Sequence, residues 1–175
     1  MRTFTIVDSP IGDLTLVNTD GVLSGLWMEI RAPGRPDASG ERTRRGFEQA
    51  ERELAEYFAG DRRAFDLATA AHGDRFQRRV WALLRRIPFG GTRSYGELAR
   101  ELGDVGLSRA VGVANARNPI AIVVPCHRVI GSDGSLKGYA GGVERKRFLL
   151  DLEAAATGAT AATGATAGAA LTTLF

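Results

Sequence analysis

The sequence has very little cysteine: Cys126 is the only one in 175 residues. A single cysteine excludes an internal disulfide and a cysteine-rich zinc site, and it favours a reducing, cytoplasmic environment. Long apolar runs are also missing, since the longest, Ile120 to Pro125, is far shorter than the ~20 residues of a membrane span. The N-terminus has no long apolar segment followed by a cleavage site, so we expect neither a secretory signal nor a membrane partner.

Charge is present but unevenly distributed. Residues 1–73 carry 9 Arg and 12 Asp or Glu, a net charge of −3, whereas residues 74–118 carry 9 Arg and 4 acids, a net charge of +5. The arginine-rich segment suggests a polyanionic partner. Solvated helix faces would account for the same arginines, so charge by itself leaves both interpretations open.

The first 72 residues predict a small α+β domain. Alternating apolar and polar side chains predict a β-meander, with the turn-forming Asp20–Gly21 before its last strand, over residues 2–12, 13–21 and 22–30. Residues 31–41 are rich in Pro and Gly and predict a loop. An amphipathic helix is expected over residues 43–60, with Phe47, Ala50, Leu54 and Tyr57 or Phe58 on one stripe, and a short strand over residues 63–69.

Residues 73–153 predict a second, mainly helical domain. Apolar spacing and capping residues predict four helices, over residues 74–87, 94–103, 107–118 and 143–153. Ser108 is expected to cap the third, and Phe148, Leu149 and Leu152 to face inward on the fourth. The apolar run at 120–124 predicts a strand or extended segment. Residues 154–175 follow as a tail, of which 154–170 have low complexity and are expected to be disordered.

The second and third of these helices have the spacing of a helix-turn-helix, joined by a turn with Gly103 and Gly106. Small residues on the later helix would let a backbone approach closely: Ala110, Gly112, Ala114 and Ala116. Arg109 lies near its N-terminus, where a recognition helix touches DNA. Tight packing against a neighbouring helix explains the same small residues equally well.

Cys126 and His127 are adjacent, so their side chains point apart and a bridging water would link them more easily than a direct bond. A histidine that draws off the thiol proton creates the nucleophilic thiolate. Such a histidine needs a carboxylate on its far nitrogen, and the candidates are Glu153, Asp151 and Glu144. The alternative is that Cys126 is a small buried hydrophobic residue.

The segment "NPIAIVVPCHRVIGSDGSLKGYAGG", residues 118–142, resembles the active-site signature of the O6-alkylguanine-DNA alkyltransferases, the methylated-DNA–protein-cysteine methyltransferases. The resemblance extends through "FQRRVWALLRRIPFGGTRSYGELA" and "SRAVGVANARNP" upstream and to "KRFLLDLE" downstream. It covers roughly residues 76–153, while the N-terminal part resembles the family only in general pattern.

The resemblance implies a fold and a reaction. The fold would be a ribonuclease H-like N-terminal lobe followed by a helical lobe with a winged helix-turn-helix-like motif. The protein would transfer the alkyl group of O6-alkylguanine, and less well that of O4-alkylthymine, from duplex DNA to Cys126 in a single turnover. It would bind the minor groove, flip the base, need no cofactor or metal, and act as a monomer with possible cooperativity on DNA.

The resemblance also implies roles for matching residues. Cys126 would accept the alkyl group, His127 and Glu153 would activate it, Tyr95 would protonate the leaving guanine and Asn118 would brace the active-site turn. Arg109 would fill the gap left by the flipped base. The DNA-binding set would be Ser94, Tyr95, Arg109, Ala110, Gly112, Ala114 and Asn115. The pocket would be lined or supported by Pro125, Val129, Tyr139, Ala140, Gly141, Gly142 and Lys146.

Two other functions are weighed against this one. A lesion-binding module of the same fold without catalysis would replace the acceptor cysteine, and Cys126 is present. A thiol hydrolase using Cys126 and His127 would have no need of the basic segment or the helix-turn-helix spacing. Many family members have Ser where this chain has Ala140, which removes one side-chain hydrogen bond to the lesion.

Overall fold

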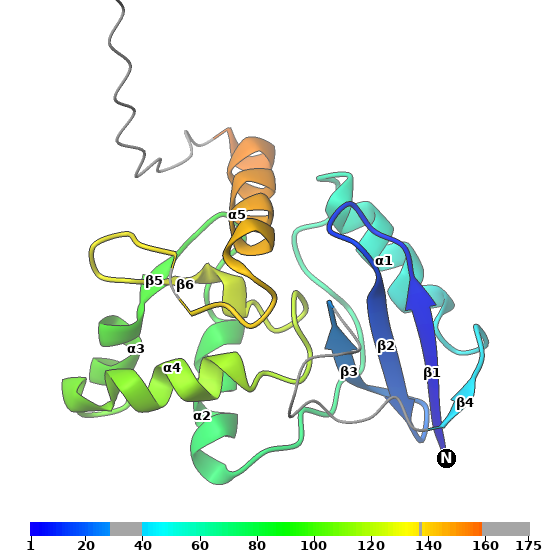
Figure 1. The fold of residues 1–175 in the computed structure, drawn as a ribbon, viewed down its shortest axis with the longest axis horizontal. Helices are drawn as coiled ribbons and strands as arrows, with labels where there is room; N and C mark the ends of the chain where they lie inside the picture. Colours follow the sequence, from blue (N-terminus) through cyan, green and yellow to red (C-terminus); the bar gives the residue numbers. More distant parts are fainter. Residues whose placement is uncertain (29–39, 137, 159–175) are drawn as a thin grey trace, which may run out of the picture.

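The computed structural model describes residues 1–28, 40–136 and 138–158. A four-stranded sheet in the order β3-β2-β1-β4 forms the first part (Figure 1). The predicted meander is confirmed: β1 (Arg2–Val7), β2 (Leu14–Thr19) and β3 (Val22–Trp27) pair antiparallel. Asp20 and Gly21 both have positive φ, 51° and 82°, as a two-residue hairpin turn requires.

The helix and the short strands of this part differ from the predictions at their ends. The predicted helix is present as α1 (Glu48–Phe58), which buries Ala50, Leu54 and Tyr57. A two-residue strand, β4 (Glu41–Arg42), pairs parallel with β1 at the end of the predicted loop. The strand predicted over residues 63–69 is wrong: only a single bridge between Leu23 and Thr69 forms there.

Three helices follow in the second part. They are α2 (Arg75–Arg85), α3 (Tyr95–Glu101) and α4 (Ser108–Ala116), with a short 3₁₀ turn η1 (Val105–Leu107) before α4. Asp74 with Gln77 and Ser94 with Glu97 form complete capping boxes, the second as predicted. Ser108 does not cap α4: it is the first residue of the helix, and its hydroxyl donates to the Val105 carbonyl.

The apolar run after α4 is a tight turn rather than the predicted strand or extended segment. Ile122 has a φ of 70°, and the Val124 N–H donates back to the Ile120 carbonyl over 2.9 Å. Cys126 then opens a 3₁₀ turn, η2 (Cys126–Arg128), followed by β6 (Val129–Ile130). β6 pairs parallel with β5 (Arg93–Ser94), which places the start of α3 beside the cysteine turn.

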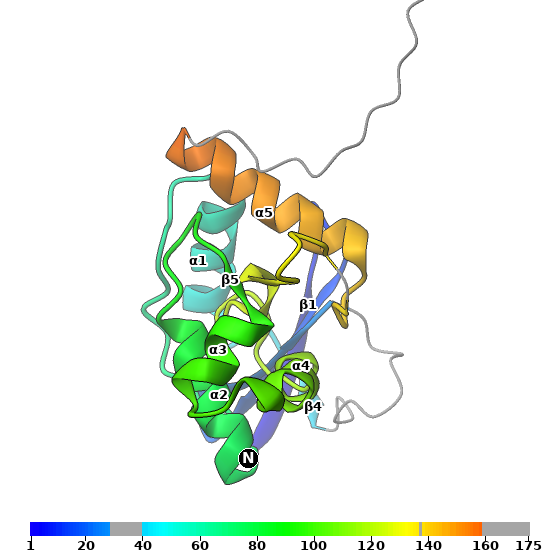
Figure 2. The same ribbon diagram turned by 90° about the vertical axis from the view of Figure 1, so that its left-hand side faces the viewer.

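The last helix, α5 (Val143–Thr157), stands near the top of the molecule in Figure 1 and runs across the top in Figure 2. It extends beyond residue 153, so residues 154–157, predicted as part of the disordered tail, are helical and end at Gly158 in the left-handed conformation. Residues 159–175 lie outside the described part. Leu149 is buried as predicted and Leu152 partly so, whereas Phe148 is 38% exposed.

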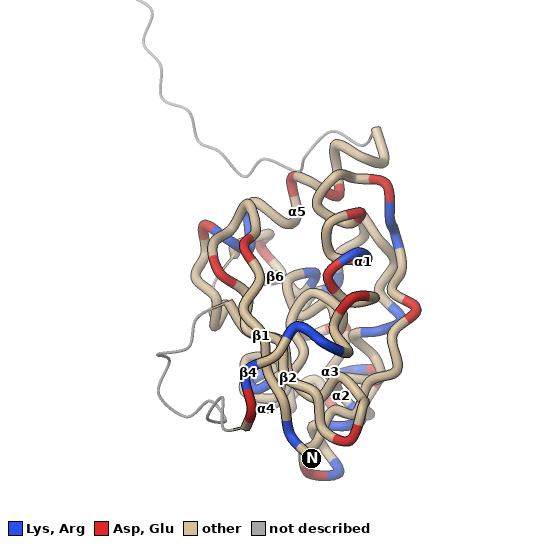
Figure 3. The backbone as a smooth tube through the Cα atoms, turned by 90° about the vertical axis from the view of Figure 1, so that its right-hand side faces the viewer, with Lys and Arg blue, Asp and Glu red and all other residues tan. Residues whose placement is uncertain are grey.

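One hydrophobic cluster includes side chains from both parts of the chain, among them Leu16, Leu54, Leu84 and Val129. The mixed α+β class is therefore built around a shared core rather than two isolated ones. Figure 3 shows acidic residues predominating along α1, in agreement with the negative charge of the first 73 residues. In the described residues no helix is long and apolar enough to cross a bilayer.

Candidate active site

Cys126 lies where the tight turn passes into η2, in the interior of the protein. It is 5% exposed, and burial raises the pKa of its thiol above the ordinary value. Nearby polar groups of Asn118 and Tyr139 and the charge of Lys146 act in the opposite direction and lower the pKa. At neutral pH the group is therefore a thiol that needs a base to become a nucleophile.

The turn that carries Cys126 is held by Asn118. Its side-chain amide donates to the Val124 carbonyl over 2.7 Å, and its Oδ1 accepts from the Ile120 N–H over 3.0 Å. A β-branched residue at positive φ, such as Ile122, is strained and persists only when its surroundings hold it. These two hydrogen bonds span the strained residue, so Asn118 braces the turn between α4 and the cysteine.

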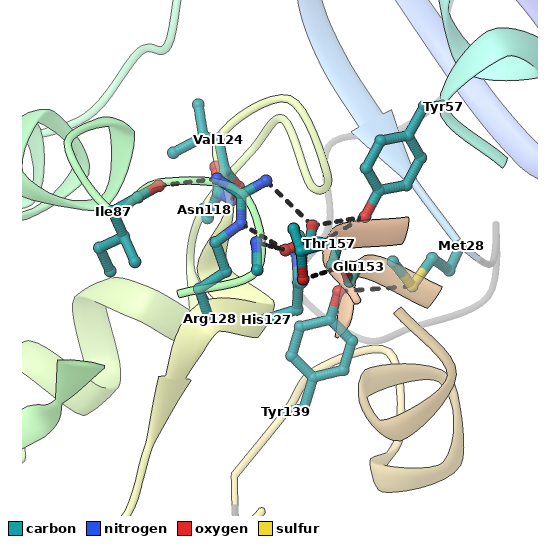
Figure 4. Close-up of polar contacts among 11 residues, drawn as sticks. Met28, Tyr57, Ile87, Asn118, Val124, His127, Arg128, Tyr139, Glu153 and Thr157 are labelled. Atoms are coloured by element: carbon teal, nitrogen blue, oxygen red, sulfur yellow. Dashed lines mark hydrogen bonds and ion pairs between the residues drawn. The ribbon is translucent and has the colours of Figure 1, made fainter. Parts of the chain in front are cut away.

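Glu153 is the carboxylate that reaches His127, and both side chains are fully buried (Figure 4). Its Oε1 lies 2.7 Å from His127 Nε2 and also accepts from Tyr57 and Arg128. Its Oε2 accepts from Arg128 Nε and the Gly90 N–H, each over 2.9 Å. Although burial opposes ionisation, His127 and Arg128 hold the pKa of Glu153 at about 2.

This arrangement selects one tautomer of His127. Because Glu153 is an anion that only accepts, Nε2 of His127 must carry the proton and donate it. Nδ1 is then an acceptor; it is buried and has no hydrogen-bond partner among the described protein atoms. Burial also lowers the pKa of His127, so the imidazole is neutral and its Nδ1 lone pair is open to a proton. The site thus holds a base in the residue next to the thiol.

Tyr95, Tyr139 and Lys146 form a second group beside the thiol. The Lys146 ammonium lies 5.9 Å from the Tyr95 ring centre and 5.7 Å from that of Tyr139, and it donates to the Val129 carbonyl. Burial lowers the pKa of Lys146 to about 8 and raises that of Tyr95. Tyr95 is therefore protonated at neutral pH, and the Lys146 cation lies beside both rings.

A small cavity opens on Cys126. Its free volume is about 10 Å³, and it is lined by Met28, Asn115, Ala116, Asn118, Ala121, Cys126, Tyr139, Ala140 and Gly141. Three of the predicted pocket residues, Tyr139, Ala140 and Gly141, are among them. Pro125 instead lines a separate cleft near Phe89, and Gly142 lines an outer groove beside Phe148. Val129 is fully buried beneath the site.

The exposed face of α4 differs from the one predicted. Ala114 and Asn115 are each only 2% exposed: the Ala114 carbonyl accepts from the Trp81 indole, and Asn115 Nδ2 donates to the Cys126 carbonyl. Residues two apart point to different sides of a helix, so the predicted small residues do not share a face. The residues exposed to solvent are Arg109, Ala110, Val113, Ala116 and Arg117.

The sequence interpretation missed several residues of the site, including Ala121 of the cavity lining. Tyr57 and Met28 come from the first part of the chain, and Gly90 contributes only its backbone. Arg128 stands inside the quoted signature but was given no role, although it makes two hydrogen bonds to Glu153 and one to the Ile87 carbonyl. The one signal in the sequence for Arg128 was its position directly after His127, where a basic side chain could pair with the carboxylate expected to contact that histidine. Among the described residues no group of three or more His, Cys, Asp or Glu could hold a metal ion.

Comparisons with known proteins identify the family. Residues 75–155 match the family model described as the 6-O-methylguanine DNA methyltransferase, DNA binding domain. The chain is 51% identical over 154 residues to the methylated-DNA–protein-cysteine methyltransferase of Mycolicibacterium paratuberculosis, covering 87% of this chain and 93% of the relative. It is 46% identical over 151 residues to that of Methanosarcina acetivorans, covering 86% and 97%.

Solved structures give the same result for the fold. The O6-methylguanine methyltransferase of Mycobacterium tuberculosis superposes with a TM-score of 0.80 at 47% identity, covering 89% of this chain and 94% of that one. A structure of the OGT protein of the same organism in complex with DNA superposes with a TM-score of 0.81 at 48% identity, covering 88% and 94%. This chain belongs to the methylated-DNA–protein-cysteine methyltransferase family.

Proposed function

We propose that this protein repairs O6-alkylguanine in duplex DNA by transferring the alkyl group to Cys126, in one irreversible turnover. The observation that carries the proposal is the buried His127–Glu153 pair beside the only thiol, with the Nδ1 of His127 left as an acceptor. A weaker activity on O4-alkylthymine is part of the proposal.

The reaction begins with the thiol proton. His127 Nδ1 takes it through a bridging water, and Glu153 stabilises the imidazolium that forms. The Cys126 sulfur attacks the alkyl carbon as the bond from that carbon to O6 breaks, so the electron pair of the broken bond goes to guanine. Tyr95 donates a proton to the departing base and is reprotonated from solvent. The thioether product is stable, which limits each molecule to one reaction.

DNA binding would use the exposed face of α4. Its small side chains, Ala110 and Ala116, permit close approach in the minor groove, and the flanking Arg117 can pair with phosphates. Arg109, in the first turn of α4, would occupy the space vacated by the flipped base. Ser94 and Tyr95 at the start of α3 would contact the backbone beside it. No protein partner is required, and we propose a monomer acting in the cytoplasm.

The two proposed domains share one hydrophobic core. We propose that residues 1–72 form a ribonuclease H-like structural domain, supported by the antiparallel β3-β2-β1 meander with β4 parallel to β1. Residues 73–153 would form the winged helix-turn-helix-like domain, supported by α3 and α4 joined through η1 and by the short β5–β6 pair.

The test is intact mass and peptide mapping after mixing the protein with a duplex that carries one O6-methylguanine. We expect one added methylene on the Cys126 peptide, product never exceeding protein, and no adduct in Cys126→Ala. Lesion-selective binding without an adduct would replace the transferase with a non-catalytic lesion-binding protein. Substrate turnover beyond one equivalent would indicate a hydrolase instead.

A further inference from the structure

Met28 brings the first part of the chain into the cavity of Cys126. It follows the last residue of β3, is 2% exposed, and lines the cavity together with residues from the segment 115–141. Cys126 and the loop residues 139–141 thus come from the second part of the chain, whereas Met28, which forms another wall of the cavity, comes from the first.

Met28 also contacts the loop that covers the cavity. The Tyr139 hydroxyl lies 3.7 Å from the Met28 sulfur, a contact visible in Figure 4. A Cβ added at Gly141 would lie 2.4 Å from the same sulfur, so the loop backbone passes directly over the thioether. The position of this sulfur therefore limits how closely residues 139–141 approach the thiol.

The cavity is too small for the proposed substrate while Met28 occupies this position. Its free volume of about 10 Å³ is that of roughly one water molecule. An alkylated base has many more atoms, so it enters only if some of the lining moves. Methionine is the lining side chain best suited to move, because its unbranched thioether has three rotatable bonds and repacks easily.

We propose that Met28 determines the size of the alkyl group that the protein accepts. The side chain acts as an adjustable wall opposite Cys126: it yields enough for a methyl group and resists bulky aromatic adducts. This inference rests on the proposed alkyl transfer and adds to it the substrate range.

The experiment compares single-turnover rates on two duplexes, one carrying O6-methylguanine and one O6-benzylguanine. Met28→Ala should raise the benzyl-to-methyl rate ratio on the order of tenfold, the scale on which pocket size discriminates apolar groups. Gly141→Ala, which pushes against the same sulfur, should lower the ratio. Met28→Leu keeps the volume but replaces the flexible thioether with a stiffer, branched side chain, so it should lower the ratio.

Leu16→Ala is the matched control, because Leu16 is fully buried in the same sheet and lies outside the cavity lining. It should lower stability and leave the ratio unchanged. A ratio unaltered in both Met28→Ala and Gly141→Ala, with both variants folded by circular dichroism, would refute the role of Met28. Absence of any adduct in the wild type with either duplex would instead refute the proposed function itself.

Discussion

The hydroxyl of Tyr57 donates to Glu153 Oε1 over 2.7 Å, although 96 residues separate the two in the sequence. Tyr57 lies on α1 and is fully buried, and Glu153 lies on α5. The same oxygen accepts from His127, so the helix packed on the sheet helps to hold the carboxylate that orients the His127 ring. The first part of the chain is thereby connected to the chemistry of the second.

Tyr57→Phe tests this connection. The variant removes one donor from a buried carboxylate that keeps its bonds to His127, Arg128 and Gly90, so the fold should persist. We expect the free energy of unfolding to fall by about 1.5–3 kcal/mol, the range for hydrogen bonds to charged groups. Urea titration measures it. A loss below about 0.5 kcal/mol would show that the remaining donors compensate fully.

Stability should decrease on acidification below about pH 6.5. Burial lowers the pKa of His127 in the folded protein from 6.5, so the unfolded chain binds the proton first and gains free energy relative to the folded state. The slope approaches about 1.4 kcal/mol per pH unit for one proton. His127→Asn should flatten the pH dependence between 7 and 5 in urea titrations. A slope identical in the two proteins would contradict a neutral, buried His127.

Arg109→Ala should slow transfer from duplex DNA by on the order of tenfold or more, while transfer from free O6-benzylguanine changes little. Only the duplex requires a flipped base and a side chain to fill the gap, and flipping costs a few kcal/mol. Arg52→Ala, an exposed arginine on α1, is the control and should affect neither rate. Equal losses on both substrates would show that Arg109 supports the fold rather than the DNA.

Gly25→Ala should destabilise the sheet. A Cβ at Gly25 would lie 1.9 Å from a carbon of the Trp27 ring, which is buried and cannot move without disturbing the core. Overpacking of this kind costs about 1–3 kcal/mol. Gly96→Ala is the control: its Cβ meets nothing closer than 3.9 Å, and in α3 alanine is favoured over glycine by up to about 1 kcal/mol. Thermal unfolding of the two variants should shift in opposite directions.

The sequence by itself determined the elements that depend on neighbouring residues. The Asp20–Gly21 turn requires positive φ at both positions, and the Ser94–Glu97 capping box needs residues only three apart. Because the turn and the capping box depend only on residues close in the sequence, both are present in the folded protein. The thiol and its neighbouring histidine were evident for the same reason, because Cys126 and His127 are adjacent.

Only the tertiary structure decided which distant groups complete the site. The residue pattern left Glu153, Asp151 and Glu144 open and only the family resemblance favoured Glu153. The packing of α5 is what places Glu153 against His127. The apolar run at 120–124 predicted a strand or extended segment because its residues favour one, but the hydrogen bonds that Asn118 makes with Val124 and Ile120 hold the intervening Ile122 in a turn. Tyr57 and Met28 reach the site from the sheet side, since burying both parts in one core places them there. The local secondary-structure preference of a segment does not encode such contacts, because their free energy comes from packing between residues that are distant in the sequence.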